Sequence, residues 1–138
     1  MSTQEQIAVK ERYYGEAIRY MDNAKECLVK AQKEDKYYRD TKYVRMACGT
    51  AYSGVLIALD GFLILKGIEM PAKKVKKSRK SIEYYQSNIA KMDGKMLGTL
   101  NRTYQILHLY GYYDGIDSVN VIKEGFDEAY TLIEKIKP

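Results

Sequence analysis

The sequence predicts an all-α fold, an antiparallel bundle of about five helices that forms a single domain over residues 1–138. Three observations support this prediction. A chain of 138 residues is long enough to bury one continuous core and too short for two. The sequence holds two prolines, Pro71 and Pro138, so little interrupts helix formation. Apolar residues recur at helical spacings of three and four along most of the chain, and no segment alternates as a strand does.

The first helix is expected over residues 4–33, because apolar side chains recur there at spacings of three, four or seven. A polar connection that carries two tyrosines follows at 36–39. Asp40 or Thr41 can then cap a second helix that stops at Gly67.

The second helix is apolar on nearly all sides between Ala51 and Leu65, as expected of a helix that is covered on several faces. It is therefore either the central helix of the bundle or half of a dimer seam. Its most apolar part, from Val55 to Leu65, is too short to cross a bilayer, so no membrane span is expected. Small residues that weaken this helix either allow a neighbouring helix to approach closely or are simply tolerated: Gly49, Ser53, Gly54 and Gly61.

A third helix is expected to begin at Pro71, which fits a first helical turn, and to end at Asp93 and Gly94. Its start carries six cations in eight positions: Lys73, Lys74, Lys76, Lys77, Arg79 and Lys80. Cations near a helix N-terminus are mildly unfavourable. The cluster therefore indicates an anionic partner such as RNA phosphate, a frayed first turn, or a solvated face.

A fourth helix is expected from Lys95 to about Tyr110, followed by a turn-rich loop at 111–115. Asp117 or Ser118 can cap a fifth helix, whose apolar pattern continues to the C-terminus.

Several classes of function lack their residues in this sequence. One histidine without a Glu-x-x-His motif excludes a ferritin-type di-metal centre, and no phosphate-binding Gly-rich loop is present. Cys27 and Cys48 lack metal-ligand spacing and are expected to be reduced thiols in or near the core. We therefore expect no metal and no cofactor. The polar residues 1–10 do not resemble a secretory signal, so a cytoplasmic location is expected.

The strongest chemical signal is His108 together with Arg102 on the fourth predicted helix. At about 100° per residue, both side chains fall on one polar arc with Asn101 and Gln105. A neutral imidazole can take a proton from a ribose 2′-hydroxyl, and a guanidinium can stabilise a charged phosphorane, with no metal required. Alternatively, His108 is held by a structural hydrogen bond and Arg102 is a solvated cation.

Fourteen tyrosines and no tryptophan form the second signal. Tyrosine can stack on unpaired bases, although it more often spans core and water in a small bundle. Tyr110, Tyr112 and Tyr113 are of interest because they directly follow His108. The net charge of +5 adds a mild attraction to phosphates.

The order of these segments resembles the HEPN superfamily of small helical domains over about residues 10–136. The resemblance rests on the segment from Tyr20 to Glu26, the segment from Ala51 to Gly54, and Arg102 spaced six positions before His108 and followed by Tyr110. More narrowly, the chain resembles an uncharacterised bacterial family of HEPN-like proteins.

The resemblance implies a homodimer in which two Arg/His pairs meet in one cleft. In many members this cleft is a metal-independent endoribonuclease, often a toxin paired with an antitoxin. On that basis Arg102 would contact phosphate and His108 would act as acid and base. Thr103 stands where the active pattern commonly has Asn, Asp or His, and non-catalytic HEPN domains are also common.

Two hypotheses follow from the sequence. In the first, the protein is an RNA-cleaving or RNA-binding homodimer that uses His108 and Arg102, with Asn101, Gln105, Tyr110 and the lysine run as its RNA surface. In the second, the protein is a non-catalytic interaction and dimerisation module, in which the second helix makes the dimer.

Overall fold

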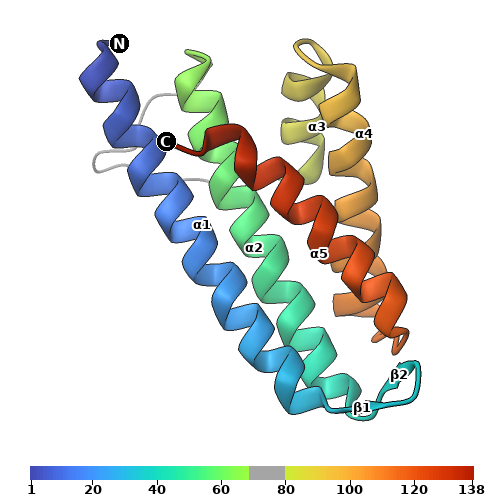
Figure 1. Ribbon diagram of the computed structural model, residues 1–138. Coiled ribbons are helices and arrows are strands. Elements are labelled where there is room, and N and C mark those ends of the chain that lie inside the picture. Colours follow the sequence, from blue (N-terminus) through green and yellow to red (C-terminus); the bar gives the residue numbers. More distant parts are fainter. Residues whose placement is uncertain (69–79) are drawn as a thin grey trace.

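A computed structural model describes residues 1–68 and 80–138, and over these residues five α-helices and one short hairpin confirm the predicted all-α bundle (Figure 1). The α-helices are α1 (Thr3–Ala31), α2 (Thr41–Leu65), α3 (Ile82–Ala90), α4 (Gly94–Thr103) and α5 (Val119–Ile133). A π-helix, Tyr104–Tyr113, continues α4, and a 3-10 turn, Glu134–Ile136, follows α5.

The helices α1 and α2 form the long antiparallel pair of the bundle (Figure 1). Asp40 caps α2 by accepting a hydrogen bond from the backbone N–H of Lys42 at 3.0 Å, as the sequence predicts. A Cβ on Gly61 would lie 2.6 Å from the Cβ of Tyr13 on α1. Gly61 therefore permits the close approach of the two helices. Of the two explanations that the sequence left open for the small residues of this helix, close approach holds at Gly61.

A hairpin of two short strands, β1 (Lys33–Glu34) and β2 (Tyr37–Tyr38), joins α1 to α2. The sequence shows no strand-like alternation here, and the hairpin is a small addition to the all-α fold. Two residues per strand are too few for a visible alternation of polar and apolar residues. The turn depends on Asp35, whose φ is 59°, a conformation that Asp tolerates better than most residues.

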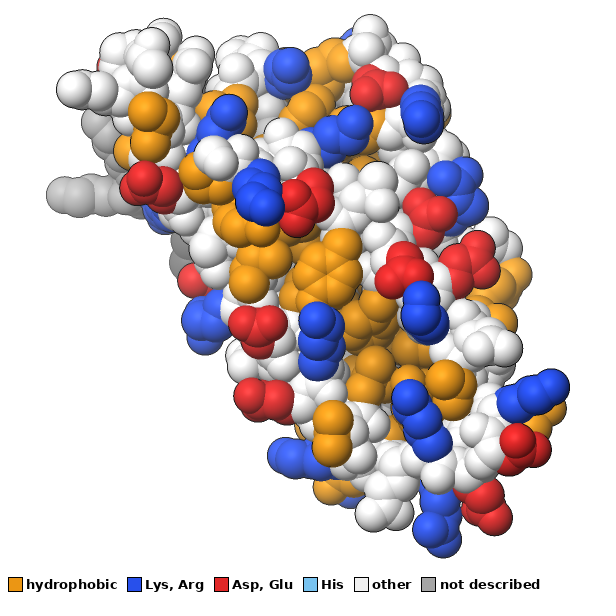
Figure 2. Space-filling view, in the orientation of Figure 1, with side chains coloured by type: hydrophobic (Ala, Val, Ile, Leu, Met, Phe, Trp, Pro, Cys, Tyr) orange, Lys and Arg blue, Asp and Glu red, His pale blue; other side chains and the backbone are white. Residues whose placement is uncertain are grey.

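The central helix of the bundle is α2, because α1, the π-helix and α5 all pack against it. By length and composition alone it could span a membrane, but 61% of its most apolar window is buried inside the bundle, as in a core helix. Figure 2 shows the face formed by α1 and α5, where Lys/Arg and Asp/Glu side chains are interspersed around exposed apolar atoms.

The second half of the chain departs from the prediction in its boundaries. The predicted start at Pro71 lies outside the described residues. The helix α3 ends at Ala90, and Asp93 caps α4 instead of ending α3, because its carboxylate accepts from the backbone N–H of Met96 at 3.0 Å. Ser118 caps α5, as predicted.

The predicted fourth helix differs from the structure more than any other predicted element does. It changes from α to π winding at Tyr104 and extends to Tyr113, so the first part of the predicted loop at 111–115 is helical. Hydrogen bonds in a π-helix span five residues instead of four. The spacing of apolar residues in a short segment does not distinguish a π-helix from an α-helix. For this reason the sequence predicts an ordinary α-helix here.

Candidate functional site

His108 is surrounded by aromatic rings. Its imidazole stacks on Tyr52 of α2, with ring centroids 4.6 Å apart, and on Tyr104 at 5.3 Å. Tyr112 lies nearly parallel to the imidazole at 5.9 Å, and Tyr113 meets it edge-on at 4.9 Å. These distances are those of attractive aromatic pairs. We call the five side chains the His108 cluster.

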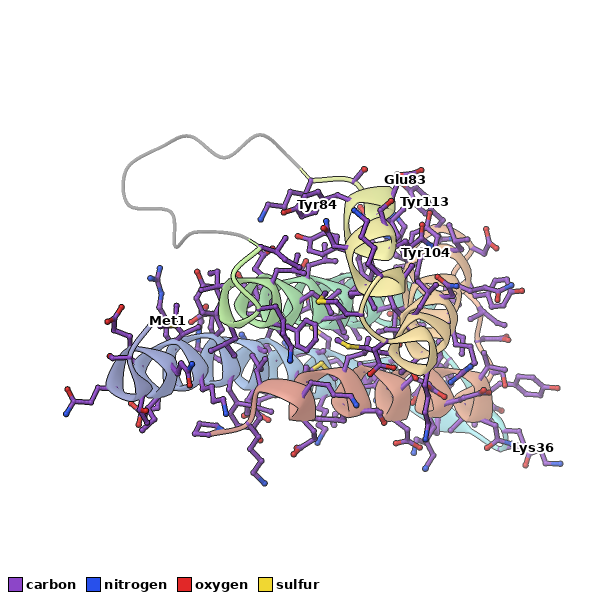
Figure 3. The ribbon with its side chains drawn as sticks, turned by 90° about the horizontal axis from the view of Figure 1, so that it is seen from above. Met1, Lys36, Glu83, Tyr84, Tyr104 and Tyr113 are labelled. Carbon is purple, nitrogen blue, oxygen red and sulfur yellow. The ribbon has the colours of Figure 1, made fainter. Side chains whose placement is uncertain are left out.

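The π-helix explains why three tyrosines from one segment reach the same histidine. Because its hydrogen bonds span five residues, side chains four and five positions apart lie over one another. Tyr104 precedes His108 by four positions, and Tyr112 and Tyr113 follow it by four and five. Figure 3 shows the labelled Tyr104 and Tyr113 on the side of α3, away from α5. Helices of the π type are rare and often occur at functional sites.

One stripe of α2 receives the π-helix, with members at spacings of three and four: Arg45, Cys48, Gly49 and Tyr52. A Cβ on Gly49 would lie 2.8 Å from the Tyr112 ring, so only a glycine leaves room for that ring. A Cβ on Gly111 would lie 2.6 Å from the Cβ of Cys48. Two glycines, one on each helix, therefore bring the His108 cluster together.

Two adjoining pockets open at the cluster. The larger has a volume of about 500 Å³ and lies between α1, α2 and the π-helix. The smaller, of about 390 Å³, continues towards the start of α3. Both are lined by Tyr52, Leu56, His108 and Tyr113. We call the two pockets together the His108 groove.

The groove is mostly apolar and aromatic. Tyr20 of α1, Met46 and Thr50 of α2 also line the larger pocket. Among the described residues, Lys80 in the smaller pocket is the one Asp, Glu, Lys or Arg that lines the groove. The larger pocket therefore suits a planar neutral group better than a phosphate.

Lys80 is the one member of the predicted cationic run whose position is described. Its ammonium donates to Asp60 at 3.0 Å, and the Tyr85 hydroxyl donates to the same carboxylate oxygen at 2.9 Å. The ion-paired side chains are only 17% and 19% exposed, so much of the Lys80 charge is compensated by α2. The other predicted phosphate contacts lie outside the described residues: Lys73, Lys74, Lys76, Lys77 and Arg79.

The structure turns Arg102 and His108 towards different helices. The Arg102 Nε donates to Glu128 of α5 at 3.1 Å, and a terminal nitrogen donates to Thr99 at 3.3 Å. His108 instead stacks on α2. The prediction that Arg102 and His108 share one polar arc is therefore wrong for a single chain. Its 100° spacing does not hold once the winding changes after Thr103, and α5 supplies a carboxylate for the arginine.

The remaining predicted contacts lie apart from the groove. Asn101 accepts a hydrogen bond from Gln86 of α3 at 2.9 Å. Gln105 donates to the Tyr110 hydroxyl at 2.7 Å, across the five-residue spacing of the π-helix. These three predicted residues are exposed, and none of them lines either pocket. Their contact with RNA stays a prediction.

Burial keeps two groups beside the π-helix neutral. Tyr52 is 9% exposed, and its burial, assisted by the neighbouring Tyr104, raises the pKa of its hydroxyl above the ordinary value. Burial raises the pKa of the Cys48 thiol to about 12. A neutral thiol is a poor nucleophile, so Cys48 has a packing role here.

Sequence patterns identify His108, Tyr112 and Tyr113 but assign no role to Arg45 or Tyr52. The seven-position spacing from Arg45 to Tyr52 was the available signal for a common helix face. No pattern connects that face to His108, because the contact joins residues far apart in the chain. Over the described residues, no group of three or more His, Cys, Asp or Glu is arranged to hold a metal.

Comparisons with known proteins give a family and a fold. No curated protein matches the chain. A solved structure of a protein of unknown function from Dyadobacter fermentans is 40% identical, with a TM-score of 0.74, and the match covers 99% of this chain and 96% of that one. A family model described as a domain of unknown function, DUF5618, matches residues 12–138, which include every described residue of the His108 groove. Because that match spans nearly the whole chain, the chain belongs to the DUF5618 family.

Proposed function

We propose that the protein binds single-stranded RNA, with unpaired bases stacked in the His108 groove. The observation that carries the proposal is the convergence of one imidazole and four tyrosine rings on two adjoining pockets. Aromatic side chains bind unpaired bases because every base has a π face, and each stacked base contributes ~1–3 kcal/mol.

The distribution of charge supports the same class of ligand. The net charge of +5 attracts a polyanion to the protein. Within the groove, the larger pocket is aromatic and the smaller pocket carries Lys80 at its edge. We therefore assign a base to the larger pocket. Lys80, whose charge is largely compensated by Asp60, adds only a weak attraction to the adjoining phosphate.

The proposal is one of binding without cleavage. His108 places an imidazole, a group able to carry a proton, inside the groove, but Arg102 pairs with Glu128 and does not supply a cation beside it. Cleavage in the manner of HEPN ribonucleases would need such a cation, which a second chain of a homodimer could provide. A HEPN-like ribonuclease dimer with a cognate antitoxin is thus a more specific proposal, in which the bound RNA is also cleaved.

Fluorescence anisotropy with a labelled single-stranded RNA, in a buffer that contains a chelator, tests binding. Tyr113→Ala removes a groove ring that is 59% exposed, and Tyr37→Ala removes a matched hairpin ring that is 54% exposed. We expect the first change to weaken binding by ~1–3 kcal/mol, which raises Kd by about 5-fold to 150-fold, and the second to have little effect. Equal losses in the two variants would contradict the proposal.

The same reactions, run on a denaturing gel, distinguish binding from cleavage. We expect the RNA to remain intact. Metal-independent cleavage that disappears in His108→Ala would favour the ribonuclease form, because loss of a proton carrier lowers such rates by about 10²–10⁴-fold. A wild-type protein that neither binds nor cleaves RNA would favour the non-catalytic interaction module.

A further inference from the structure

The C-terminal end of the π-helix must satisfy its last carbonyl groups, which have no partner further along the helix. Three of them accept backbone N–H groups of the following loop: Leu109 from Asp114 at 3.0 Å, Tyr110 from Ile116 at 2.9 Å, and Gly111 from Gly115 at 3.1 Å. The carbonyls of Tyr112 and Tyr113 are satisfied in a different way. Both accept hydrogen bonds from one side chain, Arg45 of α2.

Arg45 is closely fitted to this end of the π-helix. Its guanidinium donates to the Tyr112 carbonyl at 3.2 Å and also to the Tyr113 carbonyl. A Cβ on Gly115 would lie 2.6 Å from the Arg45 Nε, so the absence of a side chain there makes room for the guanidinium. The φ of +63° at Gly115 is also one that glycine adopts readily. Gly115 therefore both forms the turn after the π-helix and leaves room for the Arg45 guanidinium.

We propose that Arg45 is a positioning residue of the His108 groove, because it fixes the last turn of the π-helix and so holds the Tyr112 and Tyr113 rings around His108. Hydrogen bonds from a charged donor are stronger than neutral ones. Arg45 also lies on the same α2 stripe as Tyr52, seven positions earlier. One rigid helix therefore sets the rings on both sides of the imidazole.

The role of Arg45 follows from what we expect when its side chain is removed. With their carbonyls unpaired, Tyr112 and Tyr113 are free to return to α winding, which is the more common helix. In that winding the offset of five positions no longer brings Tyr113 over His108. The rings around the imidazole would then rearrange while the apolar core beneath remains closed.

The single histidine makes this rearrangement measurable by NMR, because His108 gives the only imidazole signals of the chain. These signals are sensitive to the ring currents of the surrounding tyrosines. We expect Arg45→Ala to displace them, and Arg45→Lys to restore them in part, since lysine keeps the charge but not the fork of donors. Arg39→Ala is the matched control, because Arg39 is an exposed arginine that pairs with Glu34 at 3.5 Å. It should leave the His108 signals in place.

Circular dichroism confirms that each variant is folded. If Arg45→Ala does not fold, Arg45→Lys carries the test, and it should displace the His108 signals more than Arg39→Ala does. Unchanged His108 signals in the folded Arg45 variants would overturn the inference. So would a displacement of equal size in Arg39→Ala.

RNA binding supplies a second readout, and this part alone rests on the proposed function. We expect Arg45→Ala to weaken binding roughly tenfold, the size of one lost stacked base, and Arg39→Ala to weaken it much less. Failure of the wild type to bind RNA would refute the proposed function, while the NMR comparison would still decide the role of Arg45. RNA binding equal to wild type despite displaced His108 signals would show that Arg45 positions rings that the ligand does not use, and would overturn its assignment to the site.

Discussion

Gly111 of the π-helix lies directly against Cys48 of α2, so closely that a Cβ on Gly111 would lie 2.6 Å from the Cβ of Cys48. Both residues are buried where the π-helix packs against α2. We expect Gly111→Ala to push the π-helix away from α2 and to lower the free energy of unfolding by about 1–3 kcal/mol or more. Chemical denaturation measures the change.

Gly15→Ala is the control for this substitution. Gly15 lies in α1, and a Cβ there would meet no atom within 4 Å. We expect it to raise the free energy of unfolding by up to about 1 kcal/mol, because alanine is the better helix former. A stabilising effect of Gly111→Ala would show that the two helices are not in close contact.

Alkaline pH is expected to destabilise the protein through its buried proton donors. Burial raises the pKa of Cys48 to about 12 and that of Tyr52 above its ordinary value, so the folded state holds both protons more tightly than the unfolded state does. Their contribution is fully present below pH 9 and is lost as the pH rises from about 9 towards 12. Denaturation curves recorded from pH 7 to pH 11 should show this decline.

Cys48→Ala isolates the part that is due to the thiol. The variant should be less stable than wild type at pH 7, because it leaves a small cavity beside Gly111. It should also lose less of its remaining stability above pH 9, since one of the two protons is no longer involved. Parallel pH profiles for wild type and variant would contradict the assignment to Cys48.

Sequence patterns predicted the helical fold and several helix ends, but not the winding after Thr103 or the contacts between helices. The cap at Asp40 and the cap at Ser118 are local signals, and the structure confirms both. The π-helix from Tyr104 to Tyr113 packs closely against α2, and no local pattern contains that contact. For the same reason the patterns identified His108 but grouped it with Arg102 instead of Tyr52. A site that depends on distant pairs becomes visible only when the chain is folded.

The half-buried ion pair of Asp60 and Lys80 is expected to stabilise the junction of α2 and α3. Asp60 accepts from both Lys80 and Tyr85, and the ion-paired side chains are less than one fifth exposed. We expect Asp60→Asn to lower the free energy of unfolding by about 1–3 kcal/mol in chemical denaturation, because it removes the negative charge that pairs with Lys80 and weakens two hydrogen bonds.

Asp127→Asn offers a matched comparison for that ion pair. Asp127 pairs with Lys123 at 2.9 Å on α5, but their side chains are 63% and 72% exposed. Exposed helix pairs contribute about 0.3–0.5 kcal/mol, so this variant should be close to wild type. A loss as large as that of Asp60→Asn would mean that burial does not decide the strength of these pairs.

The different neighbours of Arg102 and His108 lead to a prediction about RNA binding. Arg102 pairs with Glu128 on the side of α5, whereas His108 stacks on Tyr52 inside the groove. We expect His108→Ala to weaken binding of a single-stranded RNA by ~1–3 kcal/mol, and Arg102→Ala to change it by less than about 1 kcal/mol, as for a distant surface cation. Anisotropy titrations at one fixed salt concentration measure both, because the affinity of any polyanion depends on salt. Equal and large losses would instead place the two side chains in one site, and since one chain directs them to different helices, that site would have to combine two chains.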